Sequence, residues 1–380
     1  MYRFFTIYGL CGVLLACTES IPQIPVQTDL DGRQIHTAVD SELARYYLEH
    51  YLKGDRVRPE FDAAIEKVEG STIGGMSSLK SITQTHSTDL ATIALWQRIV
   101  RDPANCSAKR VFTDELSRLK AIKKSAAQEL PAQHDYMILF APGWFYKSQP
   151  ENGADFAKPR QVLTAVGVKT ALLEIEENGT VERNADLIAG HLVRFGRDPS
   201  NLIVVSASKA GPEVALALTK LQQSGADPDI KAWVNIGGVL RGSALADIAL
   251  KWPQSWFVKF FILGGKSSEG IESLTTRTSI ERAGRTVLPK GIAVVNYVGI
   301  PLSGQVSERA RFGYSLLRKE GPNDGLTPIV DEIATNSITI AELGLDHFFS
   351  DPEIHIKTVA LANTIVRLVQ SNLRPSDKCD

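Results

Sequence analysis

The chain has 380 residues, 43% of them apolar and 22% charged, which places it among ordinary globular proteins with enough length to bury a large core. Its 42 basic and 43 acidic residues give a formal charge of −1, so no basic surface indicates a nucleic-acid partner. No CxxC pair or cluster of His and Cys indicates a metal site, and we expect neither a metal nor a cofactor.

The first residues carry the pattern of an export signal. The stretch MYRFFTIYGLCGVLLAC contains one cation at Arg3, an apolar run that ends at Ala16, and small residues directly before Cys17. This run is too short for a comfortable membrane span and is typical of a signal peptide, here residues 1–16. A buried N-terminal helix is the alternative interpretation.

The end of this segment resembles the lipobox of bacterial lipoproteins, in which the cysteine is acylated and becomes the first residue of the mature chain. The motif LLAC makes Cys17 the lipidated residue, so acyl chains would hold the protein on a membrane of the bacterial cell envelope. Thr18 in the next position is similar to lipoproteins sorted to the outer membrane. We expect residues 17–39 to form an extended tether, because Pro22 and Pro25 disfavour regular strand pairing.

Residues 40–130 have a helical pattern and are expected to form an N-terminal extension. The segment SELARYYLEHYLKG ends at Gly54, and TDLATIALWQRIVRD ends before Pro103. A third segment, TDELSRLKAIKKSAAQEL, is predicted to begin at Thr113 or Asp114 and to end before Pro131.

Two cysteines lie outside the leader and the lipidation site, Cys106 and Cys379. An exported protein meets an oxidising compartment, in which these two could form a disulfide. Their separation in sequence leaves open whether they meet in space.

From residue 131 to 375, short apolar runs alternate with helical segments. The runs are rich in β-branched residues, and each is followed by Gly or Pro: DYMILFAPG, VKTALLEI, NLIVVSAS, IKAWVNIGG and GIAVVNYVG. Runs that are apolar on both faces are typical of parallel strands covered by helices on both sides. The sequence therefore predicts an α/β domain with a doubly wound, mostly parallel sheet.

One of these runs, NLIVVSASKAGPEVALAL, turns directly from a strand into a helix at Ser208. A strand that ends in Ser-x-Ser-x-x-Gly and opens a helix has the layout of a nucleophile elbow, in which a strained turn lifts a serine hydroxyl above the sheet. Ser206 and Ala210 stand where glycine is usual, and Gly211 follows them. A plain turn capped by Ser208 is the alternative.

A serine hydroxyl needs a base to become a nucleophile, and the base needs a group that orients it. In this layout an acid and then a histidine follow the serine along the chain. His347 lies at the end of a short segment, whereas His355 falls inside a predicted helix. Asp324, in the loop GPNDGLTP, is the candidate acid, with Asp331 and Asp346 as competitors.

Residues 135–373 look like a bacterial α/β-hydrolase of the lipase and esterase type. NDGLTP is similar to the acid loop of these enzymes, LDHFF resembles their catalytic histidine loop, and NIGGVLRGSALAD resembles the segment after the strand that follows the nucleophile. The resemblance implies Ser208 as nucleophile, His347 as general base and then acid, and Asp324 as the group that fixes the imidazole.

The same resemblance implies an oxyanion hole made of two backbone N–H groups. One belongs to Lys209, directly after the nucleophile, whose side chain we expect to point to solvent. The other is expected in LFAPGWFY, where Pro142 and Gly143 replace the family's His-Gly and the Trp144 N–H is the candidate donor. A tight turn with a packed Trp is the alternative for this segment.

Residues 242–285 are a candidate lid, because insertions at this place commonly cap the active site in hydrolases of this type. Their aromatic residues are candidates for an acyl pocket: Trp252, Trp256, Phe257 and Phe260. Packing of these side chains into the core is the alternative.

The sequence therefore predicts a lipid-anchored serine hydrolase that cleaves small-molecule or lipid esters through an acyl-enzyme. Two alternatives stay open. One is an acyltransferase, and the other is a non-catalytic lipoprotein of hydrolase fold that acts as a binding or envelope scaffold.

Overall fold

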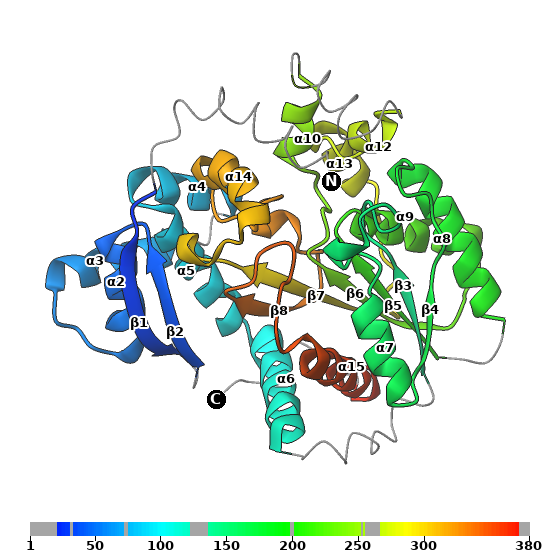
Figure 1. Ribbon diagram of the computed structural model, residues 1–380, viewed down its shortest axis with the longest axis horizontal. Helices are drawn as coiled ribbons and strands as arrows, with labels where there is room; N and C mark the ends of the chain where they lie inside the picture. Colours follow the sequence, from blue (N-terminus) through cyan, green and yellow to red (C-terminus); the bar gives the residue numbers. More distant parts are fainter. Residues whose placement is uncertain are drawn as a thin grey trace, which may run out of the picture.

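A computed structural model describes residues 21–30, 33–71, 75–121, 136–197, 201–251, 254 and 267–371. Its centre is a six-stranded parallel sheet with the strand order β4-β3-β5-β6-β7-β8 (Figure 1). The strands are β3 (Tyr136–Ala141), β4 (Lys169–Leu172), β5 (Asn201–Ala207), β6 (Ile230–Ile236), β7 (Ala293–Ile300) and β8 (Ile338–Leu343). The five runs predicted as strands are β3 to β7, so the α/β prediction is confirmed.

Helices cover both faces of the sheet, which is why its strands are apolar on both sides (Figure 1). On one face, Ile138 and Phe140 of β3 share a core with α6 (Pro103–Ala121), α7 (Ala157–Ala165) and α15 (Ile354–Gln370). On the other face, Leu139 of β3 packs with α8 (Val181–Phe195) and α9 (Ala210–Ser224). Each fully buried Leu, Ile or Phe contributes about 1.5–3 kcal/mol to folding, so two such cores hold the sheet rigid beneath the site.

The N-terminal part packs against the β8 end of the sheet. It consists of the antiparallel hairpin β1 (Ile24–Leu30) and β2 (Arg33–Val39), followed by α2 (Glu42–Glu49), a 3-10 turn (Tyr51–Lys53), α3 (Pro59–Ser71), α4 (Met76–Thr85) and α5 (Thr88–Arg101). Its apolar core is continuous with Val298 and Ile300 of β7 and Ala341 of β8. This part of the chain therefore shares a hydrophobic core with the sheet.

The prediction of an extended tether over residues 17–39 is wrong for residues 24–30 and 33–39, which form the paired strands β1 and β2. Along β1, Val26, Thr28 and Leu30 are buried and the residues between them are exposed, which is the two-residue alternation of a half-buried strand. Pro25 is exposed and pairs in register with Ala38. Proline is tolerated in a strand that has a neighbour on one side only, so it did not exclude pairing here.

Two further element predictions need correction. The third helix of the extension begins at Pro103 and not at Thr113 or Asp114, because proline fits the first turn of a helix, where its missing N–H has no partner to lose. Strand β8 was not predicted, although its residues 339–342 are all buried. The predicted helix end before Pro103 agrees with the structure. The first helix, α2, ends at Glu49, and a separate 3-10 turn continues to the predicted end at Gly54.

Several predictions fall wholly or partly outside the described residues. The signal peptide, Cys17 and the aromatic residues Trp252, Trp256, Phe257 and Phe260 lie there, as does Cys379. Cys106 is disulfide-bonded, and its pairing with Cys379 stays a prediction. Of the candidate lid, the structure describes α10 (Ala244–Ala249), α12 (Glu269–Glu272) and α13 (Thr276–Ala283). None of the helices in the described ranges is both long and apolar enough to cross a membrane.

Candidate active site

The turn between β5 and α9 holds Ser208 in a backbone conformation that serine rarely adopts. Its φ is +53°, in the left-handed region, where a residue other than glycine costs about 1–3 kcal/mol. Hydrogen bonds hold it there: the Ser208 N–H donates to the carbonyl of Ile236 at 3.0 Å, and the Ser208 carbonyl accepts from Gly211 at 2.9 Å. The strained turn presents the half-buried hydroxyl at the carboxyl end of the central strands, as the sequence predicts.

The small residues around Ser208 are required by close backbone contacts. A Cβ atom at Gly211 would lie 2.8 Å from the Cα of Gly238 and 2.7 Å from the side-chain oxygen of Asn235. A Cβ at Gly143 would lie 3.6 Å from the Cβ of Ser208, so the loop after β3 runs directly beside the candidate nucleophile. The segment after β6 and the loop after β3 therefore form two walls of the site.

Two side chains from loops at the same end of the sheet complete the constellation. The Nε2 atom of His347 lies 2.9 Å from the Oγ atom of Ser208, and its Nδ1 atom is hydrogen-bonded to the Oδ2 atom of Asp324. The other carboxylate oxygen, Oδ1, accepts the backbone N–H groups of Leu326 and Thr327, each at 2.8 Å. The backbone N–H of His347 also donates to the carbonyl of Asp324 at 2.9 Å, so the two loops are joined by main chain and side chain.

The electrostatics of the buried pair follow from this geometry. Burial opposes a charge on His347, but the Asp324 carboxylate outweighs it and raises the pKa of the imidazole above its ordinary value. Burial likewise opposes the charge on Asp324, yet the imidazole and the two backbone N–H groups lower the pKa of this carboxyl. Asp324 is thus an ionised, oriented partner, and a proton on His347 is stabilised.

The competing residues from the sequence are occupied elsewhere. Asp331 lies 3.7 Å from Arg241, and burial raises its pKa to about 6. The Asp346 carboxylate accepts two backbone N–H groups: that of Phe348, two residues later, at 3.0 Å, and that of Ser307, in a neighbouring turn, at 2.8 Å. Ser206 is buried in β5, where it accepts the indole N–H of Trp233 at 2.9 Å. His355 lies in α15, as predicted.

The two predicted oxyanion donors flank the candidate nucleophile. Lys209 directly follows Ser208, and Trp144 follows Gly143, the residue that approaches the Ser208 Cβ. Neither backbone N–H has a hydrogen-bond partner among the described residues. Buried or half-buried N–H groups usually find a partner, so two open donors beside one hydroxyl are suited to an oxyanion.

Comparison with solved structures finds similar proteins. A metagenomic carboxyl esterase matches with a TM-score of 0.52 and 20% identity, covering 63% of this chain and 77% of the other. A mature lipase from Bacillus licheniformis matches with a TM-score of 0.48 and 21% identity, covering 58% of this chain and 87% of the other. No protein-family model and no curated protein sequence matches this chain.

The chain has an α/β-hydrolase fold. The parallel sheet, the sharp turn after β5 and the helices on both faces are the common elements of this fold, which confirms the predicted fold class. At these levels of identity the likeness extends to the fold alone.

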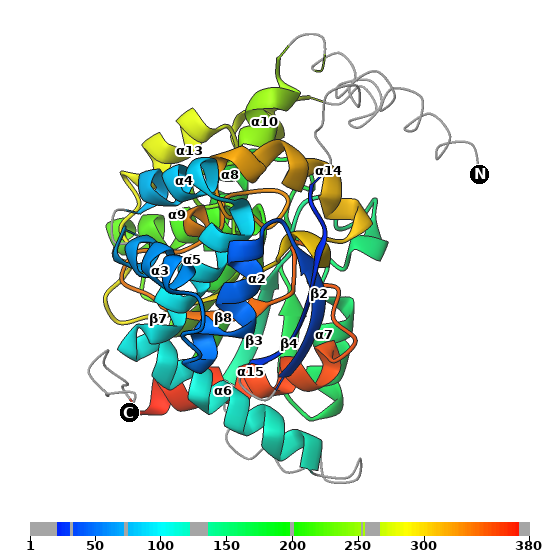
Figure 2. The same cartoon turned by 90° about the vertical axis from the view of Figure 1, so that its left-hand side faces the viewer.

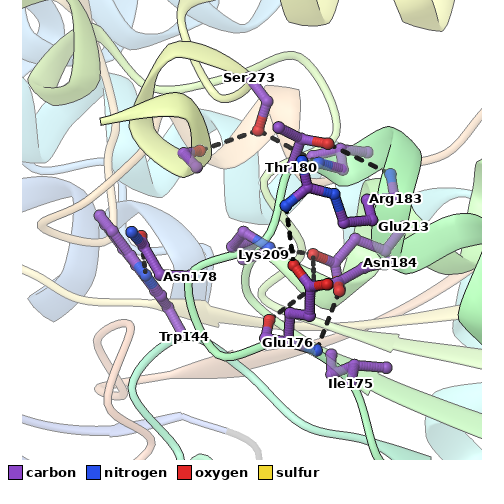
Figure 3. A network of polar contacts seen from close by, with 12 residues as sticks. Trp144, Ile175, Glu176, Asn178, Thr180, Arg183, Asn184, Lys209, Glu213 and Ser273 are labelled. Atoms are coloured by element: carbon purple, nitrogen blue, oxygen red, sulfur yellow. Dashed lines mark hydrogen bonds and ion pairs between the residues drawn. The ribbon is translucent and has the colours of Figure 1, made fainter. Parts of the chain in front are cut away.

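The side chain of Lys209 does not point to solvent, and that expectation is wrong. It is 2% exposed and forms an ion pair with Glu213, one turn further along α9 and fully buried (Figure 3). The Asn184 amide of α8 donates to the same carboxylate at 2.8 Å. Burial raises the pKa of Glu213, and the Lys209 ammonium and the Asn184 amide oppose that rise. The helix that follows the nucleophile is therefore fastened to its neighbour from inside the protein.

This network continues to the loop that carries Trp144. Asn184 also binds both backbone polar groups of Glu176, at 2.9 and 3.1 Å. Two residues later, the side-chain oxygen of Asn178 accepts the indole N–H of Trp144 at 3.2 Å (Figure 3). The Asn178 amide donates to the carbonyl of Ser267 at 2.7 Å. One loop thus braces both candidate oxyanion donors. The sequence shows Lys209 and Glu213 at a helical spacing, but nothing in it signals the roles of Asn178 and Asn184.

A second buried acid lies close to Asp324. Glu332 is fully buried, and neither of its carboxyl oxygens has a hydrogen-bond partner among the described residues. Burial, together with the nearby negative charges of Asp324 and Asp331, raises the pKa of Glu332 well above its ordinary value. A neutral Glu332 adds no negative charge beside Asp324, whose carboxylate binds the imidazole. The surrounding sequence, PIVDEIAT, carries no signal for this role.

An apolar cluster lies next to the candidate oxyanion loop. Trp144 stacks on Phe145 with ring centroids 4.6 Å apart, and both pack against residues of α10 and α12 and their neighbours: Val181, Ala246, Ile271 and Leu274. The described part of the candidate lid therefore does contact the loop beside Ser208. Within the described residues, no group of three or more His, Cys, Asp or Glu side chains could hold a metal ion.

Proposed function

We propose that this protein is a serine hydrolase that cleaves carboxylic esters through an acyl-enzyme formed on Ser208. The observation that carries the proposal is the 2.9 Å contact between His347 Nε2 and Ser208 Oγ, with Asp324 bound to the other ring nitrogen. An imidazole held in this way can take the hydroxyl proton and is stabilised as a cation by Asp324. A plain turn capped by serine requires neither partner.

The proposed reaction has two balanced halves. The Ser208 oxygen attacks the ester carbonyl while His347 takes its proton, and the oxygen that becomes negative lies between the N–H groups of Trp144 and Lys209. His347 then returns the proton to the leaving alcohol as the carbon–oxygen bond breaks. Water repeats these steps on the acyl-enzyme, releasing the acid and restoring the Ser208 hydroxyl.

Esters are the substrate class that fits the available surface. The apolar cluster beside Trp144 suits a hydrocarbon chain better than a charged group. The metagenomic carboxyl esterase, which has the same fold, is consistent with this choice. We further propose that Cys17 is acylated and that the enzyme works at the bacterial envelope, at the outer membrane, where lipid esters are at hand.

The decisive experiment is labelling with a fluorophosphonate probe, which reacts only with an activated serine. We expect the purified protein to be labelled and Ser208→Ala to lose the label without a change in melting temperature. Ser224→Ala, at the far end of the same helix α9, is the matched control and should keep it. A folded protein that takes no label, or that is still labelled in Ser208→Ala, would overturn the proposal in favour of a non-catalytic scaffold.

Two further measurements define the reaction. A series of p-nitrophenyl esters of increasing acyl length separates a short-chain esterase from a lipase. Product analysis with an added alcohol separates hydrolysis from acyl transfer, because a transferase would deliver the acyl group to the alcohol in preference to water. Inactivity on all esters, in a protein that takes the fluorophosphonate label, would point to amides or thioesters instead.

A further inference from the structure

Helix α14 (Glu308–Leu317) has an outer face that is unusual for a surface helix. Its inner residues are buried, whereas Phe312 is 54% exposed and Leu316, one turn later, is 37% exposed. At 100° per residue, Arg311 lies on one side of this apolar pair and Arg309 on the other. A membrane surface can bind such a face, because apolar side chains enter the lipid interface while arginines contact anionic lipids.

The charge of this face is not cancelled by its neighbours. Arg309, Arg311 and Lys319 have no carboxylate partner among the described residues; Arg309 contacts neutral oxygens of Glu151 and Asn152, at 3.4 and 3.3 Å. Glu320, in the 3-10 turn that follows α14 (Arg318–Glu320), forms an ion pair with Lys80 at 2.5 Å. Glu308, at the start of α14, is the one acidic group on the helix itself. A net positive face on a chain of charge −1 is suited to an anionic surface.

The inner side of α14 rests on the loop that holds the candidate acid. A Cβ at Gly325, which directly follows Asp324, would lie 2.6 Å from the Cβ of Ala310, and one at Gly313 would meet the Gly325 carbonyl. Leu245 of α10, in the candidate lid, is the other close neighbour of Gly313. In Figure 2, α14 and α10 lie side by side at one end of the molecule. Helix α14 therefore lies directly against the loop that carries the candidate acid and beside the candidate lid.

The start of the described chain also lies at this helix. Ile21 packs against the apolar cluster formed by Val306, Ala310 and Tyr314, and Pro22 lies in one cavity with Arg318 and Lys319. Four residues of fully extended chain span at most about 14 Å. An acylated Cys17 would thus hold a membrane within that distance of α14.

We infer that the outer face of α14 docks on an anionic lipid bilayer and turns the candidate active site toward it. The docking face consists of Arg309, Arg311, Phe312, Leu316 and Lys319. This inference rests on the proposed acylation of Cys17 but does not require ester hydrolysis. It makes lipids of the same membrane the substrates that reach the site first.

Quenching of a fluorescent probe by lipid measures this docking in the whole protein. The chain, purified from cell membranes and checked for acylation by mass spectrometry, is reconstituted into phosphatidylglycerol-rich vesicles that contain a headgroup spin label. A bimane probe is attached at Ser315→Cys on α14 or, as a control, at Val57→Cys, which is 61% exposed in the segment before α3. Cys106 is disulfide-bonded and does not compete for the probe.

We expect strong quenching at position 315 and little at position 57. Each cation near an anionic surface strengthens binding about 5-fold, so Arg309→Gln with Arg311→Gln should weaken docking about 25-fold and remove the difference between the two probes. Absence of quenching at position 315, or equal quenching at both positions, would overturn the inference. Hydrolysis of a soluble ester by the same samples reports on Ser208 separately, so failure of docking and failure of the proposed function are distinguishable.

Discussion

The buried ion pair behind the nucleophile predicts a large and specific loss of stability on substitution. Lys209 and Glu213 are both inaccessible to water, and removing one partner of such a pair leaves a desolvated charge. We expect Lys209→Met to lower the free energy of unfolding by about 3–5 kcal/mol at neutral pH. The double variant Lys209→Met, Glu213→Gln keeps an oxygen for the Asn184 amide and removes both charges, so it should recover most of that loss.

The loss should also depend on pH in a defined direction. Without its ammonium partner, the pKa of Glu213 rises further above its ordinary value, so the folded Lys209→Met protein binds a proton that the unfolded chain releases. Its stability is therefore greatest below the pKa of an unfolded glutamate, about 4.3, and is lost as the pH rises toward the raised folded value. The unmodified protein should show a weaker dependence over the same range.

Urea unfolding at pH 5 and pH 8 measures both effects. Lys220 and Asp186 form an ion pair between the same two helices, α9 and α8, but on the surface, so Lys220→Met is the matched control and should cost less than about 1 kcal/mol. Equal losses for Lys209→Met and Lys220→Met would refute the reasoning. Because the proposed oxyanion donor is a backbone N–H, turnover of folded Lys209→Met should fall by less than the ~100-fold that loss of such a donor typically costs.

Further predictions concern the rest of the site. Hydrolysis should decline as the pH falls through the raised pKa of His347, because the imidazolium cannot accept the serine proton; the pH profile of kcat/KM measures this effect. Asp324→Asn should lower turnover by about 10⁴-fold, which steady-state kcat measures. Glu332→Gln should gain stability relative to the unmodified protein as the pH rises above about 4.3, because the unfolded glutamate ionises while the folded one stays neutral. Urea unfolding of both proteins at pH 5 and pH 8 tests this, and the same difference in unfolding free energy at both pH values would contradict it. Gly211→Ala should cost about 1–3 kcal/mol through overpacking and reduce activity, whereas Gly190→Ala, which faces open space in α8, should melt at the same or a higher temperature.

The candidate catalytic residues could be predicted because their chemistry imposes local sequence constraints. Ser208 needs a strand, a sharp turn and a helix in immediate succession, and Asp324 and His347 need loops at strand ends further along the chain. Each of these constraints involves only a few neighbouring residues, so it can be recognised in a single sequence without an alignment. The order of the three along the chain then limits the choice to few alternatives, of which Asp331 and Asp346 were the serious ones.

Other features depend on contacts between distant segments and carry no local signal. Lys209 is paired with Glu213, whose carboxylate also accepts an asparagine amide from another helix. The raised pKa of Glu332 follows from burial and from an aspartate whose position only the fold reveals. The β1/β2 hairpin differs from the predicted tether for another reason: Pro25 argues against pairing, but the alternation of buried residues after it is that of a half-buried strand. Helix α6 starts earlier than predicted, because Pro103 follows one helix and also occupies the first turn of the next.

The shared core between the N-terminal part and the β8 end of the sheet has a practical consequence for any attempt to shorten the chain. Val298, Ile300 and Ala341 are covered by side chains from residues 24–101. A shortened protein that begins near residue 131 would therefore expose these apolar side chains to water. We expect such a shortened protein to aggregate during expression. The N-terminal part and the sheet therefore have to be expressed together as one folding unit.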